Sequence, residues 1–343
     1  MGLRRVVKRA VIVLLVVLVP PAAATLQALY QLRATMLRSV PAPEAPTGLR
    51  AVDAAPFSRA VVVAAHPEAA RIGAEVLKAD GTAIDAAVAV QAALTLVEPQ
   101  SSGIGGGAFL LYWHAPSKTL TAFDGREVAP ASATPQLFLD AKGKPLSFPQ
   151  ALVGGRSVGV PGVLRMLEAA HGRFGRTPWS RLFESSAALA RTGFTVTPRL
   201  NALLRLDPAL PSLPAARAYF FGEEGWPVAS GAKLLNAPLA DTFEQLGAAG
   251  AGAFYSGPIA QDIVAAVQGA RQPTVARGLF NVVARQWGIA ATGEATVDAA
   301  GGLSLQDLAR YQPLEREPLC LPYRRWRICG VPPPSGGVAV LQV

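Results

Sequence analysis

The chain has 343 residues and a formal net charge of +9; 51% of its residues are hydrophobic and 16% are charged. Disordered chains combine low hydrophobicity with high net charge, so this composition excludes disorder and predicts one large core or two smaller ones. The basic residues are scattered, apart from the N-terminus and the short run Pro322–Arg327. Because the sequence carries neither a clustered basic face nor a nucleic-acid-binding motif, we expect no nucleic-acid partner.

Residues 1–24 have the pattern of a secretory signal peptide. A basic start precedes an apolar run from Ala10 to Val19, and Pro20–Ala24 then supplies the small residues of a cleavage site. This apolar run is shorter than the roughly 20 residues that a membrane span needs. The alternative is an uncleaved N-terminal anchor, because residues 26–32 are still fairly apolar. In both cases the positive end stays inside, so we expect an exported protein, periplasmic or extracellular.

Residues 25–58 form a predicted linker rich in proline and alanine. Within it, Val40–Gly48 has proline at every second or third place, which prevents a helix and favours extended chain. Residues 59–343 form the third predicted region, and the patterns of regular secondary structure begin there.

Two helices are predicted first. One runs from Pro67 to about Ala79 and ends at Asp80-Gly81, with Gly81 expected as a left-handed cap. Thr82 and Asp85 then have the spacing of a capping box, which predicts the start of a second helix that closes before Pro99. Alanine on nearly every side of this second helix indicates burial against close neighbours.

A glycine-rich segment and two strands follow the helices. Gly103–Gly107 leads into a predicted strand at Ala108–Trp113, and a hairpin turn at Ser117–Lys118 leads to a second strand at Leu120–Phe123. Helical patterns dominate the remainder. They cover Val163–Gly172, Trp179–Arg191, Leu239–Leu246 and Ile259–Gln268.

The two cysteines leave two interpretations open. The spacing of Cys320 and Cys329 fits no zinc signature, and neither has a histidine nearby in sequence, so we expect no metal site and no cysteine nucleophile. In an oxidising compartment the pair would close a small hairpin. The alternative is two buried free thiols.

Two segments carry candidate chemistry. The glycine run allows close approach or positive φ, and its N–H groups suit either an anion nest or a tight, buried strand entry. It lacks the dinucleotide fingerprint and precedes a strand instead of a helix, so no nucleotide cofactor is expected.

The second segment is Asp124-Gly125-Arg126-Glu127, which follows the second strand. At such a strand end Arg126 can present its fork to a carboxylate, with Asp124 or Glu127 orienting it, or can form a structural ion pair.

These motifs belong to a longer ordered series, which resembles the large subunit of the γ-glutamyltransferase (glutathione hydrolase) family over about residues 60–343. The matching blocks are, in chain order, Gly81–Ala89, Val97–Pro99, Ser102–Gly107, Asp124–Pro130, Val158–Gly162, Phe254–Gly257, Gly301–Leu303, Asp307–Ala309 with Tyr311, and Pro332–Gly337. Many blocks in one order make the resemblance specific.

The resemblance implies an α+β fold, the αββα sandwich of the N-terminal-nucleophile hydrolases, with only the large-subunit part present. It implies a precursor that cuts itself before a threonine, giving a small subunit as partner. That threonine would cleave the γ-glutamyl amide of glutathione and pass the glutamyl group to water or to an amino-acid or peptide acceptor, without a cofactor. Arg126 would bind the α-carboxylate of the substrate.

This sequence departs from the family's pattern in four places. The threonine segment is expected beyond Val343, so no catalytic residue is assigned within the chain, which by itself is expected to be inactive. An extra stretch covers residues 269–300, one serine is missing before Gly336, and Gly125 stands where a larger residue is usual. Two alternatives therefore stay open: a non-catalytic exported protein that binds an amino acid, and a related acylase acting on β-lactam side chains.

Overall fold

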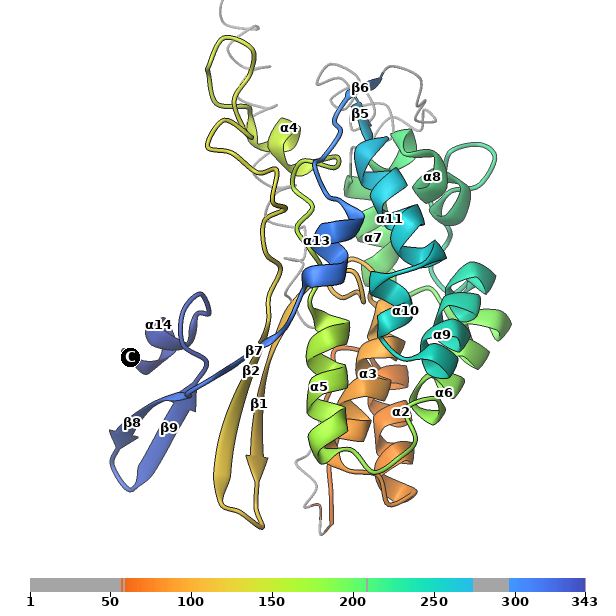
Figure 1. The fold of residues 1–343 in the computed structure, drawn as a ribbon. Coiled ribbons are helices and arrows are strands. Elements are labelled where there is room, and N and C mark those ends of the chain that lie inside the picture. Colours follow the sequence, from red (N-terminus) through yellow and green to blue (C-terminus); the bar gives the residue numbers. More distant parts are fainter. Residues whose placement is uncertain (1–56, 58, 208, 274–295, 343) are drawn as a thin grey trace, which may run out of the picture. The chain divides into compact units, whose positions relative to one another are not determined.

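The structure is a computed structural model that describes residue 57 and residues 59–207, 209–273 and 296–342 (Figure 1). The predicted signal or anchor at residues 1–24 lies outside the described residues, as does the predicted linker at 25–58 except for Phe57. Most of the predicted extra stretch, residues 274–295, also lies outside them.

Helix α3 stands at the centre of a helical layer and packs against α2, α5 and α6, while α6 also packs against α9. The bounds of these helices are α2 Pro67–Lys78, α3 Ala83–Val97, α5 Val163–Phe174, α6 Arg181–Thr192 and α9 Ala237–Ala249. The small side chains of Ala89 and Ala93 are fully buried on α3, which lets neighbouring helices approach from several sides. The predicted burial of this alanine-rich helix is therefore confirmed.

The junction between α2 and α3 confirms one prediction and corrects another. The capping box is present, because Thr82 accepts from the N–H of Asp85 while the Asp85 carboxylate accepts from the N–H of Thr82. The left-handed residue, however, is Asp80 with φ of 65°, and not Gly81. Gly81 is required for a different reason: a Cβ there would lie 2.6 Å from Cγ1 of Val76.

Strands β1 (Ala108–His114), β2 (Thr119–Gly125) and β7 (Leu314–Arg316) form an antiparallel sheet in the order β1-β2-β7. Both predicted strands and the predicted turn between them are confirmed, and β7 was not predicted. In Figure 1 the strands lie to the left of the helical layer, and α5 packs against β2. Phe174 of α5 packs on this side, with its ring centroid 4.6 Å from that of Tyr112 and 6.4 Å from that of Phe123.

The opposite face of the sheet carries exposed apolar side chains beside the Asp124–Arg316 ion pair. Leu111 pairs with Ala122 and Trp113 pairs with Leu120, so these side chains share the face that points away from α5. Leu111 is 38% exposed, Trp113 55% and Leu314 53%. An apolar face of this kind marks an interaction surface.

The remaining elements are shorter, and most of them connect the long helices. They are α4 Phe148–Leu152, β3 Phe194–Thr195, α7 Pro198–Leu206, the 3-10 helix Leu210–Ser212, α8 Pro214–Phe220, β4 Lys233–Leu234, α10 Gly252–Tyr255, α11 Pro258–Gln268, β5 Arg271–Pro273, β6 Thr296–Asp298 and α13 Leu305–Arg310. The four helices predicted after Pro161 are α5, α6, α9 and α11, with small shifts at their ends. α7 was missed, although Thr197 and Pro198 form a clear start signal, with Thr197 accepting from the N–H of Leu200.

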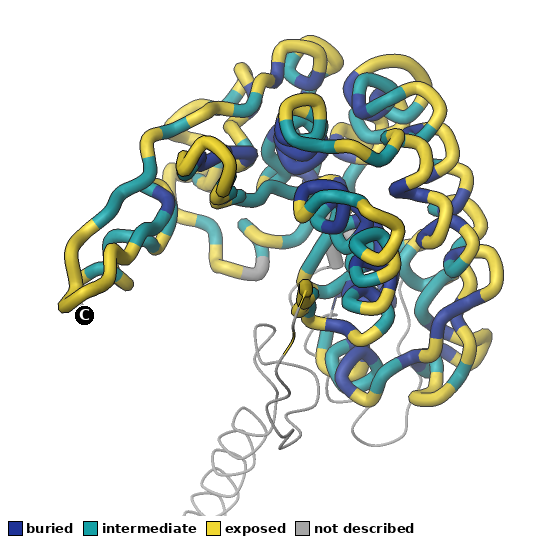
Figure 2. Tube along the Cα trace, turned by 90° about the horizontal axis from the view of Figure 1, so that it is seen from below, coloured by how far each residue is buried: buried dark blue, intermediate teal, exposed yellow. Residues whose placement is uncertain are grey.

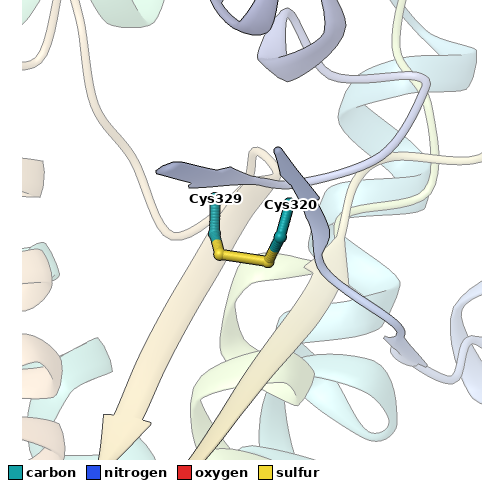
Figure 3. The surroundings of a disulfide bond; sticks show 2 residues. All are labelled: Cys320 and Cys329. Atoms are coloured by element: carbon teal, nitrogen blue, oxygen red, sulfur yellow. A yellow bond between two sulfur atoms is a disulfide. The ribbon is translucent and has the colours of Figure 1, made fainter. Parts of the chain in front are cut away.

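The C-terminal segment is a disulfide-bonded hairpin followed by a short helix. β8 (Leu319–Tyr323) pairs with β9 (Trp326–Gly330), and α14 (Gly337–Leu341) packs against both strands. Cys320 and Cys329 face each other in this register and form a disulfide with a Cα–Cα distance of 4.1 Å (Figure 3). Of the two interpretations of the cysteines, the structure therefore contains the disulfide and not two free thiols.

Many of the buried residues lie in the helices (Figure 2). The core cluster runs through α3, α5, α6 and α9, whereas between residues 312 and 342 Val331 is the one residue classed as buried. No helix in the described part of the chain combines the length and the apolar character that crossing a bilayer requires.

Candidate functional site

The motif after β2 is held in place by a buried carboxylate. Asp124 is 5% exposed, and its Oδ2 accepts a hydrogen bond of 2.6 Å from Nε of Arg316 on the neighbouring strand β7. Its Oδ1 accepts from the backbone N–H of Arg126 at 2.9 Å. Asp124 therefore fixes the backbone at Arg126 and does not pair with its guanidinium, contrary to one of the two orienting roles that the sequence suggested.

Arg126 stands at the end of β2, as predicted, with half of its side chain exposed. Its Nη1 lies 3.4 Å from Oε2 of Glu127, and its guanidinium carbon lies 6.0 Å from the ring centroid of Phe109. Glu127 is therefore the carboxylate that pairs with Arg126, through an ion pair without a hydrogen bond to its Oε2. Because a guanidinium has five N–H donors in a planar fork, this arrangement keeps donors available to a carboxylate arriving from solvent.

Glu127 lies directly beneath the glycine run. A Cβ on Gly107 would come within 2.5 Å of Oε2 of Glu127, so a side chain there would displace the carboxylate that orients Arg126. None of the glycines between 103 and 107 has a positive φ. The glycine run therefore serves close approach of the backbone and not positive φ. Gly107 is the position that requires it.

Two further sequence blocks meet at the same place. The carbonyl of Gly106 accepts from the N–H groups of Gly162 (2.9 Å) and Val163 (3.1 Å), which joins the glycine run to the start of α5. A Cβ on Gly162 would lie 2.1 Å from the hydroxyl oxygen of Tyr311. The glycine run, the start of α5 and Tyr311 thus enclose the backbone of the Arg126 motif from three other parts of the sequence.

Tyr311 secures Arg126 from the other side. Its hydroxyl donates a hydrogen bond of 2.8 Å to the carbonyl of Arg126. Burial, together with the nearby charges of Asp124 and Glu127, raises the pKa of Tyr311 to about 12. The hydroxyl is therefore protonated at neutral pH and remains a donor.

Gly125 is explained by its surroundings. A Cβ at this position would lie 2.6 Å from Cβ of Met166 on α5 and 3.1 Å from the carbonyl of Gly162. The approach of α5 to β2 therefore requires glycine here, where a larger residue is usual in the family that the sequence resembles.

Sequence reasoning missed a buried ion pair beside the glycine run. Nη1 of Arg199 on α7 lies 3.2 Å from Oε2 of Glu98, and these side chains are 7% and 1% exposed. The carbonyl of Glu98 accepts from the N–H groups of Ser101 and Ser102, so the pair anchors the turn that leads into the glycine run. The signal in the sequence was weak, because the two partners are 101 positions apart.

Among the described residues, the chemistry of this site is that of a guanidinium with free N–H donors. In the described ranges, no three histidine, cysteine, aspartate or glutamate side chains come together as a metal site. The available chemistry is one oriented, half-exposed guanidinium on a rigid turn.

Comparison with known proteins places these features in a family. The family model described as Gamma-glutamyltranspeptidase matches residues 69–343. The chain is 36% identical over 284 residues to a glutathione hydrolase proenzyme of Bacillus subtilis, covering 82% of this chain and 43% of that protein. The chain thus spans less than half the length of this relative.

Solved structures give the same result. The γ-glutamyltranspeptidase of Helicobacter pylori is similar with a TM-score of 0.71 and 29% identity, covering 84% of this chain and 74% of the other. A cephalosporin acylase of Bacillus halodurans is similar with a TM-score of 0.59 and 27% identity, covering 83% and 49%. The predicted α+β fold of the N-terminal-nucleophile hydrolases is therefore confirmed. The chain belongs to the γ-glutamyltranspeptidase family.

Proposed function

We propose that this chain is the N-terminal, large-subunit part of an exported γ-glutamyltransferase (glutathione hydrolase) precursor. The complete protein cleaves the γ-glutamyl amide of glutathione and transfers the glutamyl group to water or to an amino-acid or peptide acceptor. The chain alone is inactive in this proposal, because the nucleophile comes from sequence beyond Val343. Its support is the family membership together with relatives that carry the name proenzyme.

One observation carries the substrate class: the placement of Arg126. Its guanidinium is oriented by Glu127 at 3.4 Å, and its backbone is fixed by Asp124 and Tyr311. A rigid, half-exposed fork favours a substrate with a carboxylate, which binds in two parallel hydrogen bonds. In the proposed enzyme Arg126 holds the α-carboxylate of the γ-glutamyl group, and loss of one partner from such a pair, once the bound substrate has buried it, costs roughly 2–5 kcal/mol.

The open sheet face supports a second subunit from the same precursor. Leu111, Trp113 and Leu314 are between 38% and 55% exposed on one side of the sheet. Covering such a face with a second sheet completes the sandwich and buries the apolar side chains.

Export is supported by the disulfide, because such bonds persist in oxidising compartments. In the matured enzyme the new N-terminal threonine attacks the γ-carbonyl carbon, and its own α-amino group takes the hydroxyl proton. The amide C–N bond then breaks, and the departing amine takes up that proton and leaves as cysteinylglycine. The resulting glutamyl ester is released by water or by an acceptor amine.

An assay of the precursor that continues past Val343 tests the proposal. Matured protein should release p-nitroaniline from γ-glutamyl-p-nitroanilide and glutamate from glutathione, and chain 1–343 alone should release neither. Absence of activity on both compounds, in a matured precursor that is folded, would contradict the proposed function. If it were inactive but gave heat with glutamate in calorimetry, the non-catalytic binding protein would replace it.

The similarity to a cephalosporin acylase supports a second candidate, an acylase for β-lactam side chains. The same assay with a glutaryl cephalosporin separates the two. Faster cleavage of that compound than of the γ-glutamyl anilide would favour the acylase.

A further inference from the structure

A cavity remote from Arg126 has the features of a second ligand site. It measures about 440 Å³, within the size range of small-molecule sites. Its walls come from the start of α2, the end of α6, the β3–β4 ribbon and the start of α7. The polar lining includes His66, Glu68, Thr195, Ser230 and Lys233, and the apolar lining includes Leu189, Phe194 and Val196.

His66 gives this cavity a buried donor. The residue is 6% exposed, and its Nδ1 accepts from the N–H of Glu68 as the cap of α2. A ring nitrogen that accepts a hydrogen bond carries no proton, so the proton of the neutral ring is on Nε2. Burial lowers the pKa of His66 despite the opposing effect of Glu68, which favours this neutral form.

Nε2 of His66 faces open space. No described residue forms a hydrogen bond with Nε2. This nitrogen is also not a fully enclosed atom, so it remains accessible. His66 also lines the cavity, and its Nε2–H is the donor that we assign to the ligand there.

The charges around the cavity favour an anion. Lys233 lies opposite Thr195 in the β3–β4 ribbon, and its Nζ donates to the carbonyl of Gly193 at 3.1 Å, which leaves further ammonium protons. Glu68 also lines the cavity, and its carboxylate pairs with Arg71 at 2.8 and 3.0 Å, a guanidinium that it shares with Glu75. The N-termini of α2 and α7 also meet here and add positive potential.

We propose that this cavity binds a small organic carboxylate with a short apolar tail. The carboxylate accepts from Nε2 of His66 and from the ammonium of Lys233, and the tail packs against Phe194 and Val196. The site is independent of the proposed glutamyl site, because Arg126 does not line it.

Butyrate is a suitable probe, with 1-butanol and butylamine as uncharged and cationic analogues. We expect calorimetry on the full chain to give saturable heat with butyrate and none with the analogues, and the Nε2–H signal of His66 in NMR to shift. Lys233→Met should bind butyrate about tenfold more weakly. His66→Asn should weaken binding as well, since asparagine keeps the helix cap but loses the Nε2 donor.

Lys142→Met, at an exposed lysine outside the cavity, and Arg126→Met should both bind butyrate like the unaltered chain. Melting curves identify any variant that does not fold. If Lys233→Met does not fold, the NMR shift of His66 in the unaltered chain still decides. The proposal is overturned if the unaltered chain gives no saturable binding, if the His66 signal does not move, or if binding is lost in Arg126→Met.

Discussion

At the scale of single residues, Asp85 joins two parts of the helical layer. It is fully buried, and its carboxylate accepts from the backbone N–H groups of Thr82, Arg176 and Thr177 at 2.7 to 3.1 Å. Nε2 of His171 lies 3.4 Å from it. Burial acts to raise the pKa of Asp85, but these hydrogen bonds outweigh burial and lower the pKa.

We predict that Asp85→Asn lowers the free energy of unfolding by about 2–4 kcal/mol, because the amide group turns a donor toward buried N–H groups. In the unaltered chain the contribution of Asp85 is present above the ordinary pKa of 3.8. It is lost as the pH falls from there through the lower folded value, because the unfolded state takes up the proton first. Urea unfolding at several pH values measures both effects, with Asp262→Asn at an exposed position as the control. Equal acid dependence in the Asp85 variant and the unaltered chain would contradict this account.

Some residue pairs could be predicted from the sequence and others could not. Thr82 and Asp85 were predicted to pair because their spacing of three fits one helical turn. The place of Arg126 at the end of β2 was predicted from its neighbours. The pairing of Glu98 with Arg199 and that of Asp124 with Arg316 depend on tertiary contacts between distant segments, which no local pattern encodes.

At the scale of elements, β8 and β9 form the hairpin with the least packing support. Leu321, Tyr323, Trp326 and Ile328 lie on one face of it, and each is at least 41% exposed. On the other face, Cys320 and Cys329 line a cavity of about 560 Å³ together with Trp113 and Leu120 of the β1–β2 hairpin. An isolated two-stranded hairpin is marginally stable, so the disulfide supplies much of its stability.

We predict that replacing both cysteines with serine destabilises the closed hairpin by about 2–3 kcal/mol, the effect of removing a short covalent loop. Hydrogen exchange should accelerate at amides of β8 and β9 and stay unchanged in α3 and α6. Reduction of the unaltered chain should have the same effect. Unchanged exchange in β8 and β9 after either treatment would show that packing alone maintains the hairpin.

Helices were predicted better than strands, for a physical reason. Helices such as α5 and α11 are specified by apolar residues that recur within one segment, so their existence follows from local sequence. β7 has three residues, and it is a strand because Leu314–Arg316 pairs with β2. Its partner comes from a distant segment, so the pattern within β7 is too short to predict it.

At the scale of the whole molecule, one face of the β1-β2-β7 sheet exposes apolar side chains. Helices cover one side of the β1-β2-β7 sheet, and Trp113, Leu111 and Leu314 remain exposed on the other. A fold prediction from family resemblance expects this, because the sandwich needs a second sheet.

We predict that Trp113→Lys makes chain 1–343 less prone to self-association, because it replaces an exposed apolar side chain of this face with a charge. The same change should weaken assembly with the small subunit of the proposed precursor. Val63→Lys, at a position 87% exposed and outside the sheet, is the matched control and should change neither property. Size-exclusion chromatography of the chain alone and of the matured precursor measures both. Normal assembly of the Trp113 variant would argue against this face as the subunit interface.

Carboxylate recognition by Arg126 is the central claim, and one kinetic comparison tests it most directly. The matured precursor is assayed on γ-glutamyl-p-nitroanilide and on the γ-aminobutyryl anilide, which lacks the α-carboxylate. Arg126→Met should lower kcat/KM for the first compound by a factor of at least about 30, the equivalent of roughly 2 kcal/mol, and leave the second nearly unchanged. Arg173→Met, at a side chain 49% exposed against 50% for Arg126, should alter neither. Retention of the full preference for the carboxylate-bearing anilide by Arg126→Met would contradict the account.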